Sequence, residues 1–235
     1  MKKLKEYIDE SNYIVFFGGA GVSTESGVPD FRSVDGIYNQ EWRYPPEKII
    51  SYTFFKKNTA EFFDFYRKKL LHLDVLPNKA HKALAKLEDS GKLKAVITQN
   101  IDGLHQKAGS KNVLELHGSI WRNFCLNCNK SYSAEEIQKS KDIPICHCNS
   151  VIKPDIILFE ESLDDQIMSE SLYHISKADM LIIGGTSLGV YPAAGLLQAF
   201  GGKKLVLINK TATHFDGKAD LIIRDSIGEA MSFLI

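Results

Sequence analysis

Short apolar runs alternate along the chain with longer segments in which apolar residues recur at helical spacing. The runs are bounded by glycine or polar residues, which is typical of buried strands. They lie at residues 13–17, 94–98, 112–116, 155–159, 179–183, 204–208 and 221–224. The helical pattern covers residues 2–10, 57–72, 78–90, 163–177, 191–200 and 227–235. Strands separated by helices predict an α/β fold with a doubly wound, mainly parallel, Rossmann-like sheet.

Two segments interrupt this alternation of strands and helices. Residues 34–72 are rich in aromatic side chains and end in a helical pattern, and residues 119–150 carry all four cysteines of the chain. We expect them to meet as one smaller domain, made of a helical insert and a zinc ribbon. The remaining residues, 1–33, 73–118 and 151–235, then form a discontinuous domain around the predicted Rossmann-like sheet.

Composition and charge exclude several classes of protein. The 235 residues hold 29 basic and 29 acidic side chains, so the net charge is zero, which argues against a nucleic-acid or membrane-surface partner. The N-terminus is charged rather than apolar, and no apolar run is long enough to span a bilayer. We therefore expect a cytoplasmic protein with reduced cysteines. The sequence does not indicate an oligomeric state.

The first apolar run ends in a glycine-rich turn, GGAGVSTESG, from residue 18. Glycines at the end of a buried strand let a phosphate approach main-chain N–H groups, as in dinucleotide sites. The pattern lacks the third glycine of the usual fingerprint, so a turn without a ligand is an alternative interpretation. An ordinary dehydrogenase would also have a strand ending in an acidic residue about 20 residues later. The segment there, VPDFRSVDGIYNQEWRYPP, has no strand pattern.

Polar side chains follow two further strands. Gln99, Asn100 and Asp102 come after residues 94–98, and His117 comes after residues 112–116. Open α/β sheets bind ligands at such strand ends, and a histidine there has a pKa suited to a general base. Alternatively, Asn100 and Asp102 form a polar turn that bonds its own backbone, and His117 is a packed or surface residue.

The cysteines form two close pairs, Cys125-x-x-Cys128 and Cys146-x-Cys148, separated by 17 residues. This spacing predicts one structural, tetrahedral zinc ion without an open coordination position. The second pair is unusually tight, which leaves open whether His147 replaces one thiolate. Four free thiols without metal are the alternative.

The motifs GGAGVSTESGVPDFRS, TQNIDGLHQKAG, LHG, the four cysteines, GGTSLGVYPAA and LIN occur in this order. Together they closely resemble the sirtuins, which are NAD-dependent protein deacylases, here of a short bacterial type. The resemblance extends from about residue 10 to the end of the chain. It implies a protein-lysine deacetylase that consumes NAD and releases nicotinamide and O-acetyl-ADP-ribose.

The resemblance also implies roles for individual residues. His117 is the expected catalytic base, with Asn100 and Asp102 as catalytic partners. Phe159, Gly189 and Val190 are expected to contact the acyl-lysine peptide. The expected NAD contacts are Gly19, Ala20, Gly21, Thr24, Asp30, Phe31, Arg32, Gln99, Asn100, Ile101, Asp102, His117, Gly185, Thr186, Ser187, Asn209, Ser226 and Ile227.

Two other functions use the same residues. ADP-ribosyl transfer would follow the same NAD cleavage with a different acceptor, and an NAD-sensing module would bind partners through its zinc domain without catalysis. The retained His117 favours deacylation over ADP-ribosyl transfer, because the later step of deacylation needs a base. The intact set of Asn100, Asp102 and His117 argues against a module without catalysis.

The sequence departs from the family pattern at the substrate strand. Family members have Phe-Gly-Glu where this chain has Phe159-Glu160-Glu161, and two acidic residues there could favour basic peptide flanks. The Tyr-x-x-Arg pair that marks desuccinylating members is absent from residues 57–72. An acidic acyl group would lack its arginine partner, so we expect neutral acyl groups to be preferred.

Overall fold

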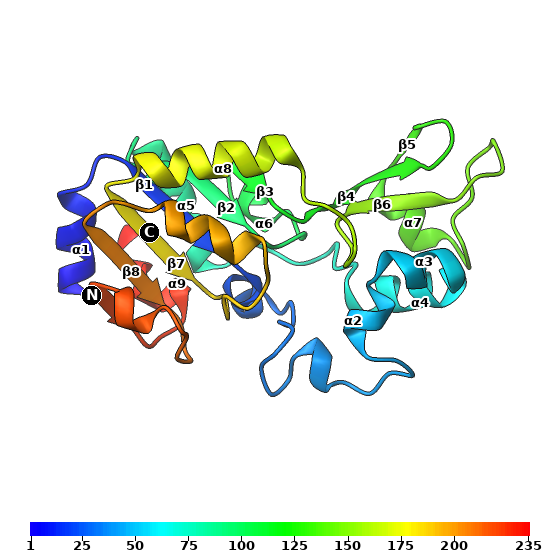
Figure 1. The fold of residues 1–235 in the computed structure, drawn as a ribbon, viewed down its shortest axis with the longest axis horizontal. Coiled ribbons are helices and arrows are strands. Elements are labelled where there is room, and N and C mark those ends of the chain that lie inside the picture. Colours follow the sequence, from blue (N-terminus) through cyan, green and yellow to red (C-terminus); the bar gives the residue numbers. More distant parts are fainter.

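The computed structural model describes residues 1–235 and contains a six-stranded sheet in which all paired strands are parallel (Figure 1). The strand order is β3-β2-β1-β7-β8-β9, which reverses direction between β1 and β7. In such sheets the ligand crevice lies outside the carboxyl ends of the strands at this reversal. The predicted fold class is therefore confirmed. The strands are β1 (Ile14–Gly18), β2 (Leu93–Thr98), β3 (Val113–Glu115), β7 (Met180–Gly184), β8 (Lys204–Ile208) and β9 (Leu221–Ile223).

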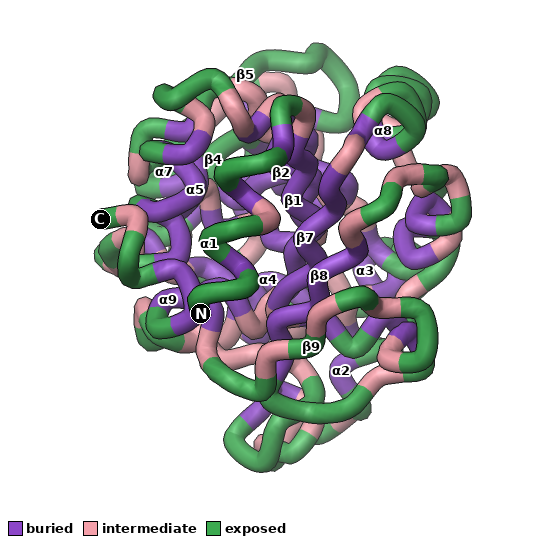
Figure 2. Tube along the Cα trace, turned by 90° about the vertical axis from the view of Figure 1, so that its left-hand side faces the viewer, coloured by how far each residue is buried: buried purple, intermediate pink, exposed green.

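Both faces of the sheet are covered by helices, because successive strand residues point to opposite faces. Phe16 belongs to a core that includes side chains of α1 (Lys2–Asp9), α5 (Lys79–Asp89) and α9 (Ile227–Ala230). Phe17 belongs to a second core with α8 (Asp165–Lys177) and the 3-10 helix η4 (Ala193–Ala199). Figure 2 shows the buried strands at the centre, with exposed segments of helices outside them. The sheet is thus the middle of three layers.

A second lobe, at the right of Figure 1, combines helices with a small antiparallel sheet ordered β5-β4-β6. Its core joins aromatic side chains such as Phe55 and Phe62 to Ile120, Ile137 and Ile152. The expected meeting of the helical insert and the cysteine segment is therefore confirmed, while the domain boundaries stay a prediction. The elements are α2 (Pro46–Ile49), α3 (Tyr52–Lys57), α4 (Thr59–Lys69), β4 (Gly118–Cys125), β5 (Ser131–Tyr132), α7 (Ala134–Lys139) and β6 (Ile152–Ile156).

The predicted strand at residues 155–159 is wrong. The strand here is β6 (Ile152–Ile156), and it pairs with β4 in the small sheet rather than with the central sheet. The apolar run continues beyond β6 because Leu158 fills the core of the second lobe. Pro154 is tolerated because β6 is an edge strand.

Helix ends follow local capping chemistry. Asn78 accepts hydrogen bonds from the backbone N–H groups of Ala80 and His81 at the start of α5, where the predicted helical pattern also begins. Residues 34–56, which precede the predicted helical pattern, contain the 3-10 helix η3 (Ile37–Asn39), α2 and α3, and Ser51 caps α3. The expected closing helix is divided into α9 and the 3-10 helix η6 (Ser232–Leu234). None of the helices combines the length and the apolar character needed to cross a membrane.

Two buried histidines, His81 and His105, predict a loss of stability in acid. Their rings are 4.7 Å apart, and burial lowers the pKa of His81 to about 4 and that of His105 well below 6.5. Below pH 6.5 the unfolded chain binds protons that the folded chain excludes, so the free energy of unfolding falls as the pH falls. For His81 alone we expect a loss of about 2 kcal/mol between pH 7.5 and pH 5.

Urea unfolding at both pH values measures this loss. His81→Gln is the matched variant, since it retains a side-chain acceptor for the Asn78 backbone N–H group but cannot titrate. It is expected to reduce the pH dependence. An unchanged pH dependence in this variant would show that His81 is not a source of the effect.

Candidate active site

Two glycine-rich turns interlock at the carboxyl ends of β1 and β7. The backbone N–H group of Gly21 donates to the Gly185 carbonyl at 2.8 Å, and that of Gly19 donates to the Gly184 carbonyl at 3.2 Å. A Cβ atom at Gly21 would lie 2.8 Å from the Gly185 Cα atom, and Gly185 itself has φ +60°. The close approach therefore requires glycine on both sides and shapes the floor of the crevice.

Asn209, just after β8, holds the second glycine-rich turn by its amide. Its Oδ1 atom accepts from the Thr186 N–H group at 3.1 Å, and its Nδ2 atom donates to the Thr186 carbonyl at 2.7 Å. Gln99 donates to the Thr186 hydroxyl at 3.2 Å from the end of β2. Three predicted cofactor residues from three strand ends are thus brought together.

Arg32 bridges the first loop to the second turn. Its guanidinium donates to the Ser187 hydroxyl at 3.0 Å, and the Asp30 carboxylate accepts from the backbone N–H groups of Arg32 and Ser33. Phe31 is half-buried against the core of the second lobe. This arrangement leaves a cation at the open side of the crevice, where an anionic ligand would be stabilised.

A buried hydrogen-bonded cluster joins Ser23, Asn100 and Asp102. The Ser23 hydroxyl donates to the Asp102 carboxylate at 2.6 Å and accepts from the Asn100 side-chain amide at 3.1 Å. Burial raises the pKa of Asp102, while its bonds from Ser23 and from the Leu104 N–H group favour the charged form. The sequence does not single out Ser23 for this cluster, because a hydroxyl two residues after a glycine resembles any turn serine.

His117 is oriented for use as a base. Its Nδ1 atom lies 3.0 Å from the Gln99 carbonyl oxygen, which can only accept, so the Nδ1 atom carries the proton and the Nε2 atom is an acceptor. Burial lowers the pKa of His117, and the bond to Gln99 opposes this shift. The imidazole is therefore neutral at pH 7 and can accept a proton at Nε2.

The expected substrate segment runs beside α3. Backbone bonds at 3.0 Å join the Phe159 N–H group to the Ile50 carbonyl and the Tyr52 N–H group to the Phe159 carbonyl. Phe159 keeps an exposed ring. Gly189 is exposed and Val190 half-buried in the loop between β7 and η4. The structure thus leaves all three expected peptide contacts at least partly accessible.

The two acidic residues of this segment are both engaged within the chain. Glu161 accepts from Lys153 at 3.0 Å and from the Leu158 N–H group at 2.8 Å. Glu160 has φ +77°, a conformation that favours glycine, and its carboxylate accepts from the Thr53 N–H group in the first turn of α3. Glu160 therefore keeps a glycine-like backbone, and Glu161 is not free to select basic peptide flanks.

The remaining predicted cofactor residues are less closely connected. Ala20 lies in the 3-10 helix η1 (Ala20–Val22), and the Thr24 hydroxyl donates to the Gly21 carbonyl at 3.0 Å. Ile101 is half-buried. Ser226 donates to Glu25 at 3.1 Å, and Ile227 is buried with its side chain under Gly184. Ile227 can therefore offer a ligand only its backbone.

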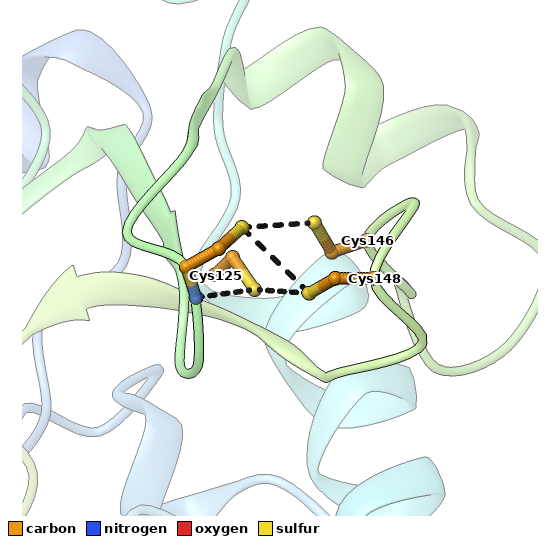
Figure 3. A group of neighbouring side chains, drawn as sticks. Cys125, Cys146 and Cys148 are labelled. Atoms are coloured by element: carbon orange, nitrogen blue, oxygen red, sulfur yellow. Dashed lines mark hydrogen bonds between the residues drawn. The ribbon is translucent and has the colours of Figure 1, made fainter.

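The four cysteines converge in the second lobe, and Figure 3 labels Cys125, Cys146 and Cys148. Their sulfur atoms all lie within 4.8 Å of one another, with Cys125 and Cys148 at 3.4 Å and Cys128 and Cys146 at 3.5 Å. Tetrahedral zinc with bonds of about 2.3 Å separates its thiolates by about 3.8 Å. Backbone N–H groups of Asn127 and Cys128 face the Cys125 sulfur, as they would a thiolate. The donor set fits a structural zinc ion.

Comparison with known proteins agrees with this geometry. The family model described as the Sir2 family matches residues 19–192, which include both glycine-rich turns, His117 and the four cysteines. The chain belongs to the Sir2 family. The resemblance to sirtuins inferred from the motifs is therefore confirmed. The expectation that the chain belongs to a family of NAD-dependent enzymes is confirmed as well.

Individual Sir2 relatives align over nearly their whole length. An NAD-dependent protein deacetylase of Clostridium acetobutylicum is 57% identical over 100% of this chain and 98% of its own. An NAD-dependent protein deacetylase of Staphylococcus aureus is 42% identical over 100% of this chain and 98% of its own length. A solved Sir2 structure with a deacetylated p53 peptide and 3'-O-acetyl ADP-ribose has a TM-score of 0.92 and 41% identity, covering 99% of this chain and 96% of that one. A second solved Sir2 structure, bound to an acetylated peptide, has a TM-score of 0.88 and 38% identity, covering 100% of this chain and 96% of that one.

Proposed function

We propose that this protein is an NAD-dependent protein-lysine deacetylase that releases nicotinamide and O-acetyl-ADP-ribose. The observation that carries the proposal is the neutral imidazole of His117, held through Nδ1 by the Gln99 carbonyl with Nε2 as an acceptor. A module that only bound NAD would not need such a base. The names of the Sir2 relatives and the acetylated peptide and acetyl ADP-ribose in solved family members support the same reaction.

Each part of the site has a proposed task. The glycine-rich turns at Gly19, Gly21 and Gly185 let the phosphates approach the chain closely, and Arg32 supplies a positive charge beside them. Thr186 and Asn209 hold the adenosine end. Asn100 and Asp102 hold the nicotinamide end. The Asp102 carboxylate also stabilises the positive charge that develops on the ribose as nicotinamide leaves.

His117 acts after nicotinamide has left. Bound NAD supplies the ADP-ribose that receives the acetyl group. The Nε2 atom of His117 accepts the proton of a ribose hydroxyl, which then attacks the acyl carbon. Water then adds to the acyl carbon and the bond between that carbon and the lysine nitrogen breaks, which releases lysine and leaves the acetyl group on the ribose. A neutral imidazole at pH 7 is the required state, and the lowered pKa supplies it.

The substrates that this arrangement favours are acyl-lysine side chains of proteins or peptides. The peptide would lie along the segment around Phe159 and contact Gly189 and Val190. The partly accessible positions of these residues support this path. The net charge of zero gives no indication of a nucleic-acid or membrane partner.

The decisive experiment is mass spectrometry of an acetyl-lysine peptide incubated with the protein, with and without NAD. We expect acetyl loss only with NAD, with O-acetyl-ADP-ribose formed in equal amount. Nicotinamide release without deacetylation would indicate NAD hydrolysis or ADP-ribosyl transfer and contradict the proposal. NAD binding with no turnover of acetyl or longer acyl peptides would indicate a binding module instead.

We further propose a preference for neutral acyl groups. Tyr66 is fully buried, and the Arg67 guanidinium is bonded to Ser140 and to the Asp142 carbonyl, so neither supplies a free partner for a carboxylate. The carboxylate of a succinyl group would therefore lack the charge-assisted bidentate bond that a free arginine supplies. We expect acetyl-lysine to be processed at least about tenfold faster than succinyl-lysine in matched peptides. Faster desuccinylation in the same assay would overturn this preference.

A further inference from the structure

Strand β4 departs from regular pairing directly behind the predicted nicotinamide site. Ser119 pairs with Asp155, and the next pair is Asn123 with Pro154, so residues 120–122 have no partners in β6. Instead, the Ile120 N–H group donates to the Ile101 carbonyl at 2.9 Å. Bulges of this kind redirect side chains at the edge of functional sites. Here the bulge turns β4 toward the loop that follows β2.

Trp121 contacts that loop through its polar atom. Its indole Nε1 atom donates to the Asp102 carbonyl oxygen at 2.8 Å. The next residue, Gly103, has φ +71°, and a Cβ atom there would lie 2.6 Å from the same Nε1 atom. The loop and the indole are therefore fitted to each other at a distance that only glycine allows.

Asp102 is thus held from two sides by different groups. Its carboxylate bonds Ser23 and the Leu104 N–H group inside the crevice, while its carbonyl bonds Trp121 behind the crevice. Trp121 is 37% exposed and forms part of the wall of a hollow of about 400 Å³, beside Gln106 and Arg122. Core packing therefore does not explain why a tryptophan occupies this position. Its indole N–H donor, which bonds the Asp102 carbonyl, does explain it.

We propose that Trp121 is a positioning residue that fixes the backbone of Asp102 and thereby aims its carboxylate at the nicotinamide end of NAD. The catalytic consequence rests on the proposed function, but the effect on the loop does not. Losing one such hydrogen bond should loosen the turn without removing any group that touches the cofactor. Phe replaces the ring and lacks the donor, so Trp121→Phe isolates this bond.

The experiment compares Trp121→Phe with the wild type by amide hydrogen exchange and by kinetics. We expect exchange at the Leu104 amide, which donates to Asp102, to become about five- to tenfold faster. We expect kcat to fall and the inhibition constant of nicotinamide to rise by similar factors. The Kd of ADP-ribose, which has no nicotinamide, should stay within about twofold, a split that general destabilisation would not produce.

Trp42→Phe is the matched control, because Trp42 packs edge-on against Phe65 in the second lobe. This variant should leave both the Leu104 exchange rate and the kinetic constants at their wild-type values. Unchanged Leu104 exchange in Trp121→Phe would overturn the inference whether or not the enzyme turns over. So would equal losses of nicotinamide and ADP-ribose binding. A wild-type protein that does not deacetylate would contradict the proposed function, while faster Leu104 exchange in the variant would still support the positioning role.

Discussion

Replacing His117 with alanine is expected to lower the deacetylation rate by about 10³-fold while changing NAD affinity by less than about twofold. The variant removes the Nε2 acceptor but leaves the glycine-rich turns, Arg32 and Asn209 in place. Nicotinamide release should be affected less than acetyl transfer, since the base acts after the glycosidic bond breaks. Mass spectrometry of both products, with calorimetric titration of NAD, measures the two effects separately.

His174→Ala provides the control for this variant. His174 is another half-buried histidine with a pKa lowered by burial, but it lies on α8 and contacts Tyr13 and Asn112. Its loss should leave turnover within about twofold. Deacetylation that persists in His117→Ala would show that another group is the base. The wild-type kcat/KM should also rise with pH to a plateau, with an apparent pKa below 6.5, because only neutral His117 accepts a proton.

Removal of one zinc ligand is expected to produce the largest loss of stability. Cys128 is exposed, so Cys128→Ala sacrifices little packing and reports mainly on the metal. We expect zinc content to fall from one ion per chain toward zero and Tm to fall by on the order of 10 °C or more. Elemental analysis by mass spectrometry and differential scanning calorimetry measure the two quantities.

His147→Ala tests whether the histidine of the tight pair shares the metal. Its Nδ1 atom lies 3.2 Å from the Cys146 sulfur, yet the four thiols alone form the compact group. We expect this variant to retain its zinc and a Tm within about 3 °C of the wild type. Zinc loss equal to that of Cys128→Ala would instead make His147 a ligand. A Cys128→Ala protein with full zinc and unchanged Tm would contradict the four-thiolate site.

Local chemistry explains which elements could be predicted from the sequence. Residues 204–208 form β8 as expected, because one apolar run is bounded by charged residues and an asparagine. The helical pattern that begins at residue 78 likewise predicts α5, and the Asn78 side chain caps the first turn of that helix. The prediction of a central-sheet strand at residues 155–159 is wrong because an apolar run has the same composition whether it lies in the central sheet or fills the core of another lobe.

The candidate site also contains residues that the sequence indicates and residues that it does not. His117, Asn100 and Asp102 follow strands and stand out as chemical groups, so sequence patterns and family resemblance both indicate them. Ser23 and Trp121 act through bonds to Asp102 that join residues 79 and 19 positions apart. Nothing in the residues around either one specifies those bonds, since they depend on how the first loop and the bulge of β4 fold against the turn.

The place of β1 in the sheet has a consequence for synthesis of the protein. β1 lies between β2 and β7, and β7 begins only at Met180. All five residues of β1 are buried in the finished fold. A nascent chain that has emerged only through β3 therefore exposes β1 as an unpaired apolar edge, the kind of surface that aggregates or engages chaperones. The crevice itself cannot form until Gly185 has left the ribosome to meet Gly21, so the cofactor can stabilise only a nearly complete chain.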